Sequence, residues 1–142
     1  MNRAVLKPPY LLFLGDAGSA LDCKTALGLV EWRPEVCIGQ LRYPNCRVDT
    51  GLPDMDIRQA RSAGARSLVI GIAPSGGVLK ADWESTLASA LDAGMDLVSG
   101  LHTPLESVPR LANAAYRSGT RLVDVRQPPA ELPLATGLPR TG

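Results

Sequence analysis

The sequence predicts an α/β fold in which a five-stranded parallel sheet lies between two layers of helices. Five short apolar runs of strand length recur along the 142 residues, and segments with helical periodicity separate them. The apolar residues of the first and third runs are nearly continuous, which is typical of strands buried on both faces of a parallel sheet. Strands that alternate with helices connect by right-handed crossovers, so we expect helices on both faces of the sheet.

The five expected strands share Leu, Val or Ile content and flanking glycines or prolines. They cover residues 10–14, 36–41, 67–72, 96–99 and 121–125. The chain contains only one Phe, two Trp and three Tyr, so its core must be built mainly from aliphatic side chains. Such a core suits a parallel sheet buried under helices.

Four helices are expected between these strands, each with apolar residues on one stripe. They cover residues 22–32, 55–63 and 83–93, with a fourth that begins near Pro109 and ends at Gly119. Asp54 and Asp82 are the expected N-caps of the second and third helices, because an aspartate side chain accepts hydrogen bonds from the first turn. Gly64 and Gly94 are expected to end these two helices.

These elements form one Rossmann-like, three-layer α/β/α domain, which we assign to residues 1–126. A flavodoxin-like sheet is the alternative, because the sequence does not determine strand order. Residues 127–142 are rich in Pro and Gly and have no helical or strand period. We expect this segment to be a linker or a tail that leads toward a further domain.

Composition excludes several classes of partner. The net charge is +1, from 15 basic and 14 acidic residues, which gives no electrostatic case for nucleic acid or an anionic membrane. The first apolar run is too short for a membrane span. The three cysteines have no C-x-x-C spacing and the chain has a single His, so neither a metal site nor a disulfide framework is expected. We expect inert thiols and a cytoplasmic protein.

The loop after the first strand carries candidate anion-binding residues, because ligands of open α/β sheets bind at the carboxyl ends of the strands. Residues 18–25 have the G-x-x-x-x-G-K-T spacing of a phosphate loop, with Cys23 in place of the second glycine. The alternative is that the last two residues simply open a helix. The candidates are Gly15, Asp16, Ala17, Lys24 and Thr25.

Two further strand-end loops carry candidates. Ser75, Gly76 and Gly77 follow the third strand, and their N–H groups suit an anion, although a tight turn without a ligand is the alternative. Gly100 and His102 follow the fourth strand. His102 is the candidate general base, and the alternative is a satisfied surface histidine.

The other two loops are less specific. The loop after the second strand is unusually long and contains Asp49, Thr50 and Asp54, and long loops in compact domains are often functional. After the fifth strand, Asp124 and Arg126 either pair with neighbours or face the cleft.

Seven runs of the sequence, in this order and spacing, carry a resemblance to a known family. They are FLGDA (residues 13–17), KTALGLVEWRPE (24–35), GQLR (39–42), DTGLPDM (49–55), LVIGIAPSGG (68–77), AGMDLVSGLH (93–102) and LVDVR (122–126). Together they resemble the N-terminal domain of the D-glutamate N-acetyltransferase family, long catalogued as a domain of unknown function. The resemblance extends from about residue 9 to residue 142.

The resemblance implies a Rossmann-like N-terminal domain joined to a C-terminal P-loop NTPase-like domain. It also implies acetyl transfer from acetyl-CoA to the amino group of D-glutamate. The G-x-x-x-x-G-K-[ST] loop of the second domain is absent from this sequence, so we expect the chain to be inactive alone. No cofactor is expected in this chain, and acetyl-CoA is implied for the full-length family.

Three hypotheses follow. In the first, the loops at residues 15–17, 75–77 and 100–102 form half of an active site for an acidic amino acid or part of acetyl-CoA. His102 would be the base, and the N–H groups of residues 75–77 would stabilise the oxyanion. In the second, the chain is a non-catalytic ligand-binding or oligomerisation domain. In the third, residues 18–25 bind a nucleotide.

Overall fold

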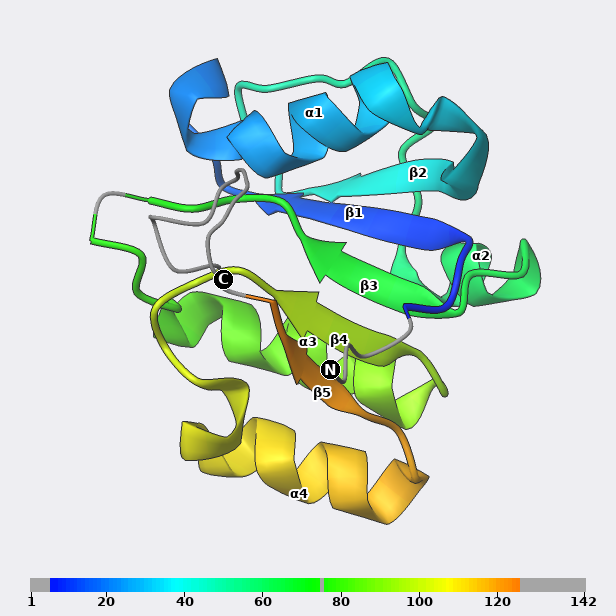
Figure 1. Ribbon diagram of the computed structural model, residues 1–142, viewed down its shortest axis with the longest axis vertical. Coiled ribbons are helices and arrows are strands. Elements are labelled where there is room, and N and C mark those ends of the chain that lie inside the picture. The colour runs from blue at the N-terminus through cyan, green and yellow to red at the C-terminus, as the bar shows by residue number, and fades with distance from the viewer. Residues whose placement is uncertain (1–5, 75, 126–142) are drawn as a thin grey trace, which may run out of the picture.

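The computed structural model describes residues 6–74 and 76–125, and they form a five-stranded, all-parallel sheet (Figure 1). The strands are β1 (Tyr10–Gly15), β2 (Cys37–Arg42), β3 (Ser67–Ile70), β4 (Asp96–Ser99) and β5 (Leu122–Asp124). Their order across the sheet is β2-β1-β3-β4-β5. The predicted parallel sheet is confirmed, and its order is the flavodoxin-like one of the two that the sequence leaves open.

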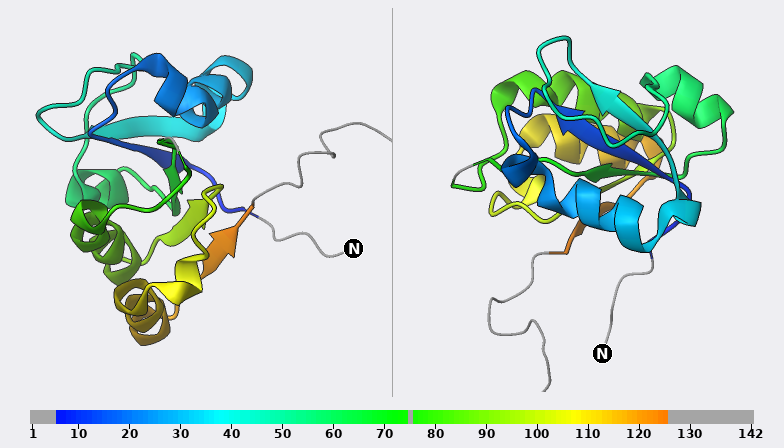
Figure 2. Two further views of the ribbon diagram at one scale, coloured as in Figure 1. Left: turned by 90° about the vertical axis from the view of Figure 1, so that its left-hand side faces the viewer. Right: turned by 90° about the horizontal axis from the view of Figure 1, so that it is seen from above.

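Four α-helices and four short 3₁₀ helices connect the strands. The α-helices are α1 (Lys24–Trp32), α2 (Ile57–Ser62), α3 (Glu84–Asp92) and α4 (Pro109–Ser118). The 3₁₀ helices are η1 (Ala20–Cys23), η2 (Pro34–Val36), η3 (Ala81–Trp83) and η4 (Leu105–Ser107). Helix α1 lies on one face of the sheet, and α2, α3 and α4 lie on the other (Figure 2). The predicted three-layer, Rossmann-like α/β/α architecture is therefore confirmed.

The core lies on both sides of the two central strands, β1 and β3. Residues 11–14 have no exposed surface, and every residue of β3 is buried, as their continuous apolar pattern predicts. The Phe13 ring packs edge-on against Tyr43 and Trp83, with ring centroids 5.7 Å apart in both pairs. Directly after β3, Gly71 lets α1 approach the sheet, because a Cβ atom there would lie 2.6 Å from the Cβ of Ala26.

Both predicted aspartate caps are wrong. The N-cap of α2 is Asp56, whose side chain forms a capping box with Gln59. Asp54 instead pairs in parallel with Gln40 beside β2, which keeps the backbone extended for two more residues. Asp82 lies inside η3, and α3 begins after Trp83 without a side-chain cap.

The predicted helix ends are confirmed. Gly119 is the C-cap of α4 with φ 72°, and Gly64 and Gly94 adopt φ near 100° one residue past the C-caps of α2 and α3. Among the described residues, no helix has the length and apolar character needed to cross a bilayer. The predicted linker at 127–142 lies outside the described residues.

Candidate functional site

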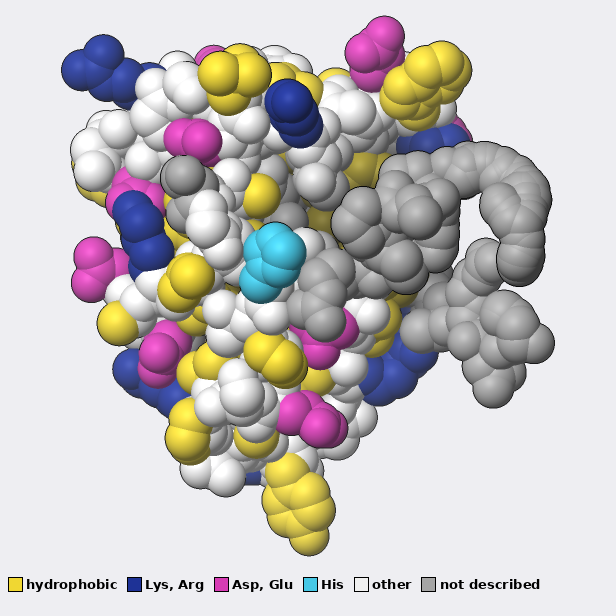
Figure 3. Space-filling model, turned by 60° about the vertical axis from the view of Figure 1, so that its left-hand side comes forward, with side chains coloured by type: hydrophobic (Ala, Val, Ile, Leu, Met, Phe, Trp, Pro, Cys, Tyr) yellow, Lys and Arg dark blue, Asp and Glu magenta, His cyan; other side chains and the backbone are white. Residues whose placement is uncertain are grey.

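The carboxyl ends of all five strands lie along one edge of the sheet, the left edge in Figure 1. The chain leaves β1 in one direction to form β2 and then returns past β1 to form β3. This reversal makes the β1–β3 boundary the topological switch point, which is where open α/β sheets bind their ligands. The loops after β1 and β3 flank this switch point, and Figure 3 shows this side of the molecule with the only histidine, in cyan, exposed near its middle.

Asp16, directly after β1, is a charged group at this switch point. Its carboxylate accepts hydrogen bonds from Lys80 Nζ at 2.8 Å and from Trp83 Nε1 at 3.1 Å, and 19% of its side chain is exposed. The Lys80 ammonium holds the pKa of Asp16 below its usual range, and Asp16 in turn raises the pKa of Lys80. Both groups are therefore charged at neutral pH.

Lys80 and Trp83 are site residues that sequence reasoning missed. The Trp83 side chain is fully buried, and the Lys80 ammonium lies 5.8 Å from the centre of its ring. In the sequence, the signal for them is a lysine followed by an aromatic residue in the loop after the third strand. The glycines at 76 and 77 are the stronger pattern in that loop. Trp83 thus anchors the loop while the Lys80 head group stays accessible.

The phosphate-loop spacing at residues 18–25 folds as a 3₁₀ helix leading into α1. Cys23, which replaces the second glycine, is fully buried, and burial raises the pKa of its thiol to about 11. Lys24 and Thr25 are exposed in the first turn of α1. This geometry is that of the alternative in which these residues open a helix.

The loops after β3 and β4 meet at His102. The His102 N–H donates to the Gly77 carbonyl at 2.9 Å, and a Cβ atom on Gly77 would lie 2.1 Å from Cδ2 of the imidazole. Gly77 has φ 65° and donates its own N–H to Pro74 O at 2.8 Å, so this donor is already engaged in a turn. Of the other two residues expected to donate to an oxyanion, Gly76 is exposed and Ser75 lies outside the described residues.

The described candidates in the loops after β1, β3 and β4 share this rim, whereas Lys24 and Thr25 lie in α1 and Ser75 lies outside the described residues. The β1 loop joins the β3 loop through the Asp16–Lys80 pair, and the β3 loop joins the β4 loop through Gly77 and His102. Gly15 and Ala17 are buried beside Asp16, and Gly100 is exposed before His102. Asp124 is not a rim group of this kind, because its carboxylate accepts the Leu105 N–H and so fastens η4 to β5.

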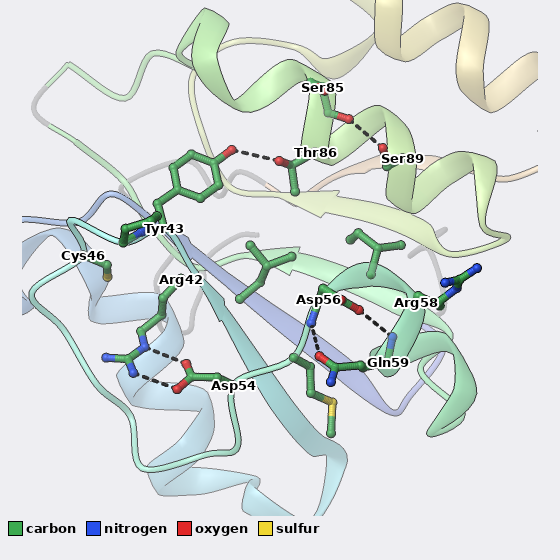
Figure 4. A pocket seen from close by; sticks show the side chains of 14 residues that line it. Arg42, Tyr43, Cys46, Asp54, Asp56, Arg58, Gln59, Ser85, Thr86 and Ser89 are labelled. Carbon is green, nitrogen blue, oxygen red and sulfur yellow. Dashed lines mark hydrogen bonds and ion pairs between the residues drawn. The ribbon is translucent and has the colours of Figure 1, made fainter.

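A separate groove lies beside β2, on the sheet face that α2 and α3 cover (Figure 4). It has a volume of about 700 Å³, and α2, only six residues long, leaves this end of β2 open toward α3. Tyr43 lines this groove and also contacts the end of β1. Its hydroxyl hydrogen-bonds with Thr86 at 2.9 Å, and its backbone N–H donates to Gly15 O at 2.8 Å.

The polar groups of the groove are largely engaged with one another. Arg42 holds Asp54 by two hydrogen bonds of 2.7 and 2.8 Å, and Asp56 is occupied by its capping box (Figure 4). Hydrogen bonds from Arg42 lower the pKa of Asp54, and the hydrogen bond from Gln40 lowers that of Asp49. These pairs shape the loop after β2 and leave few polar groups for a ligand.

Gln40, which lies in β2, holds the loop after β2 in place. Its side chain is fully buried, donates to Asp49 at 2.9 Å and Asp54 at 3.2 Å, and accepts both the N–H and the hydroxyl of Thr50. The predicted polar residues Asp49, Thr50 and Asp54 thus form one closed network. Within the described part of the chain, no group of three or more His, Cys, Asp or Glu residues is arranged to hold a metal ion.

A family model described as a domain of unknown function, DUF1611_N, with a Rossmann-like fold, matches residues 43–128, which is more than half of the chain. The chain belongs to the DUF1611_N family. A crystal structure of a DUF1611 family protein from Anabaena variabilis superposes with a TM-score of 0.68 at 33% identity. That match covers 92% of this chain and 40% of the other.

This DUF1611_N domain also matches two curated relatives named D-glutamate N-acetyltransferase. One, from Tritonibacter scottomollicae, is 44% identical over 97% of this chain. The other, from a Pseudoalteromonas species, is 41% identical over 96% of it. The resemblance noted from the sequence is confirmed, and the chain spans about two fifths (41%) of the length of each relative.

Proposed function

We propose that this DUF1611_N domain forms part of an enzyme that transfers the acetyl group of acetyl-CoA to the amino group of D-glutamate. The observation that carries the proposal is the 44% identity, over 97% of the chain, to a relative named for that activity. The relatives are more than twice as long as the matched region. We therefore expect a C-terminal domain to complete the site, and the DUF1611_N domain alone to be inactive.

The reaction requires a base and an oxyanion partner. The substrate ammonium first loses a proton, and the free amine nitrogen then forms a bond to the thioester carbonyl carbon. As the carbon–sulfur bond breaks, a second proton passes from the nitrogen to the sulfur, and the sulfur leaves as a thiol. His102 is the candidate base, and the exposed Gly76 N–H is a candidate donor to the developing oxyanion.

A chimaera tests the proposal directly. This chain replaces the matching region of the Tritonibacter relative, and thioester loss is measured with D-glutamate as acceptor. Acetyl transfer well above the rate without acceptor is expected. A chimaera that folds but transfers nothing, beside an active relative, contradicts the proposal.

His102 has its own test in the same chimaera. His102→Ala is expected to lower kcat by at least tenfold. This threshold is set below the smallest typical effect of a general base, which is about 10²-fold. Glu106→Gln, an exposed change in the next 3₁₀ helix, is the matched control and leaves kcat unchanged. An unchanged rate in His102→Ala removes His102 from the mechanism.

The second candidate function is a non-catalytic assembly domain, and the exposure of Trp32 favours it. Trp32 is the last residue of α1 and is 78% exposed, and Leu21 in η1 is 74% exposed. Trp is enriched in protein–protein interfaces relative to the rest of the surface. If assembly is the only role, Trp32→Glu changes the oligomeric state in sedimentation while His102→Ala leaves acetyl transfer intact.

A further inference from the structure

We propose that Asp16 and Lys80 recognise the two charged ends of an amino-acid substrate, with Asp16 taking the ammonium and Lys80 a carboxylate. This inference rests on the proposed function and assigns it a binding site. It adds Lys80 and Trp83 to the rim residues expected from the sequence. It also gives Asp16 a cation as its partner, since a carboxylate repels an anion.

The position of the pair is the first argument. Asp16 follows β1 and Lys80 belongs to the loop after β3, so the two residues face each other across the switch point of the sheet. Crevices at switch points are where open α/β sheets bind small ligands. The groove beside β2 is the competing concavity, but Arg42 there is 25% exposed and makes three side-chain hydrogen bonds, whereas Lys80 is 45% exposed and makes one to Asp16.

The two partners also differ in how firmly the surrounding residues hold them. Asp16 is fixed by the Trp83 indole N–H, and Trp83 is buried against Phe13. The Lys80 side chain is 45% exposed, and its flexible stem carries the ammonium above the indole ring. The Asp16 carboxylate is therefore fixed, while the Lys80 side chain can adopt another rotamer and release it.

Charge balance is the third argument. An amino acid at the switch point can place its ammonium on Asp16 Oδ2, where Lys80 Nζ now lies, and one carboxylate on the displaced Lys80. Asp16, Lys80 and these two groups of the ligand then each keep an opposite partner. The second carboxylate of D-glutamate takes its partner elsewhere in the enzyme. The rim thus suits a zwitterion, and a ligand with only one charged end leaves one member of the pair unmatched.

A purely structural role for the pair is the alternative. Exposed ion pairs contribute about 0–1 kcal/mol to stability, and this loop is already fastened by Leu79 N–H to Thr103 and His102 N–H to Gly77. Loss of the Lys80 ammonium should consequently leave the fold intact. Weaker substrate binding would then report on recognition and not on unfolding.

The test uses the chimaera with Lys80→Met, Asp16→Asn and, as matched control, Glu35→Gln. Glu35 forms an equally short pair, 2.7 Å, with Arg33 at the opposite edge of the sheet. For D-glutamate, Lys80→Met and Asp16→Asn are each expected to raise the KM and the calorimetric Kd at least tenfold, while the KM for acetyl-CoA changes less than twofold. Glu35→Gln is expected to change neither, and thermal midpoints confirm that each variant folds.

The outcomes separate the two proposals. Unchanged KM and Kd for D-glutamate in a folded Lys80→Met variant overturn the recognition site, even if acetyl transfer proceeds. D-glutamate binding that is weakened by both substitutions, in a chimaera that transfers no acetyl group, supports the recognition site and overturns the acetyltransferase function. An equal rise in the KM values of D-glutamate and acetyl-CoA also overturns the site, because it indicates a general structural effect.

Discussion

The loops that follow β1 and β2 lie side by side yet treat their charges in opposite ways. After β2, the Gln40 side chain and the Arg42–Asp54 pair form a network in which each charged group has its partner inside the same loop. After β1, Asp16 reaches out to a lysine 64 residues away whose side chain is 45% exposed. The first arrangement holds the loop after β2 in one conformation. The second leaves an ion pair at the switch point in which a ligand can replace Lys80 as the partner of Asp16.

The contrast teaches which polar residues to associate with stability and which with binding. A buried polar network is worth most when every member is satisfied, and removing one member leaves the others unpaired. An exposed ion pair contributes little to stability. We therefore expect substitutions in the network of β2 and its following loop to affect folding. Substitutions of Asp16 and Lys80 should affect substrate binding.

The largest expected effect is that of Gln40→Leu on stability. Its loss removes four side-chain hydrogen bonds and leaves the Thr50 N–H without its acceptor, while Asp49 keeps the Gly51 N–H, so the free energy of unfolding should fall by about 3 kcal/mol. Denaturant titration measures this. Thr50→Val, which removes only the hydroxyl, should cost about 1 kcal/mol. A loss below about 0.5 kcal/mol in Gln40→Leu would mean that the network does not stabilise the loop.

Gly77→Ala comes next and should act mainly on activity. The new Cβ collides with His102 Cδ2, so the imidazole must move and kcat of the chimaera is expected to drop about tenfold. The backbone penalty of a positive φ adds about 1 kcal/mol of destabilisation. Gly51→Ala is the control, because Gly51 has φ 91° with open space around it in the β2 loop. Equal activities in the two variants would show that the position of His102 is irrelevant.

The smallest expected effect concerns Cys23. Its folded pKa of about 11 exceeds the ordinary thiol value of 9.0, so the thiol stabilises the fold fully well below pH 9 and progressively less as the pH rises toward 11. Wild type should lose about 1 kcal/mol more than Cys23→Ala between pH 8 and 10. Urea titrations at both pH values measure it, and identical pH slopes would contradict the burial argument.

The sequence predicts the sheet and its rim well because both depend on local patterns. Continuous apolar runs identify β1 and β3, and the parallel sheet then places Gly15, Gly77 and His102 at one edge. The strand order cannot be predicted in this way, because it depends on packing between segments far apart in the sequence.

The predictions fail where a long-range contact outweighs a local preference. Asp54 has the right residue type for a helix cap, yet its pairing with Gln40 and Arg42 draws the backbone along β2. Lys80 looks like an ordinary surface lysine, and only the fold brings it to Asp16. The apparent phosphate-loop spacing folds as a 3₁₀ helix that leads into α1, with the buried Cys23 in the place of the second glycine.

The most direct measurement is a crystal structure of the chimaera with D-glutamate bound. We expect the amino acid at the switch point, with a carboxylate on Lys80 and its ammonium bound to Asp16 on one side and facing His102 on the other. D-glutamate bound in the groove between β2 and α3, or wholly within the remaining part of the enzyme, would contradict it.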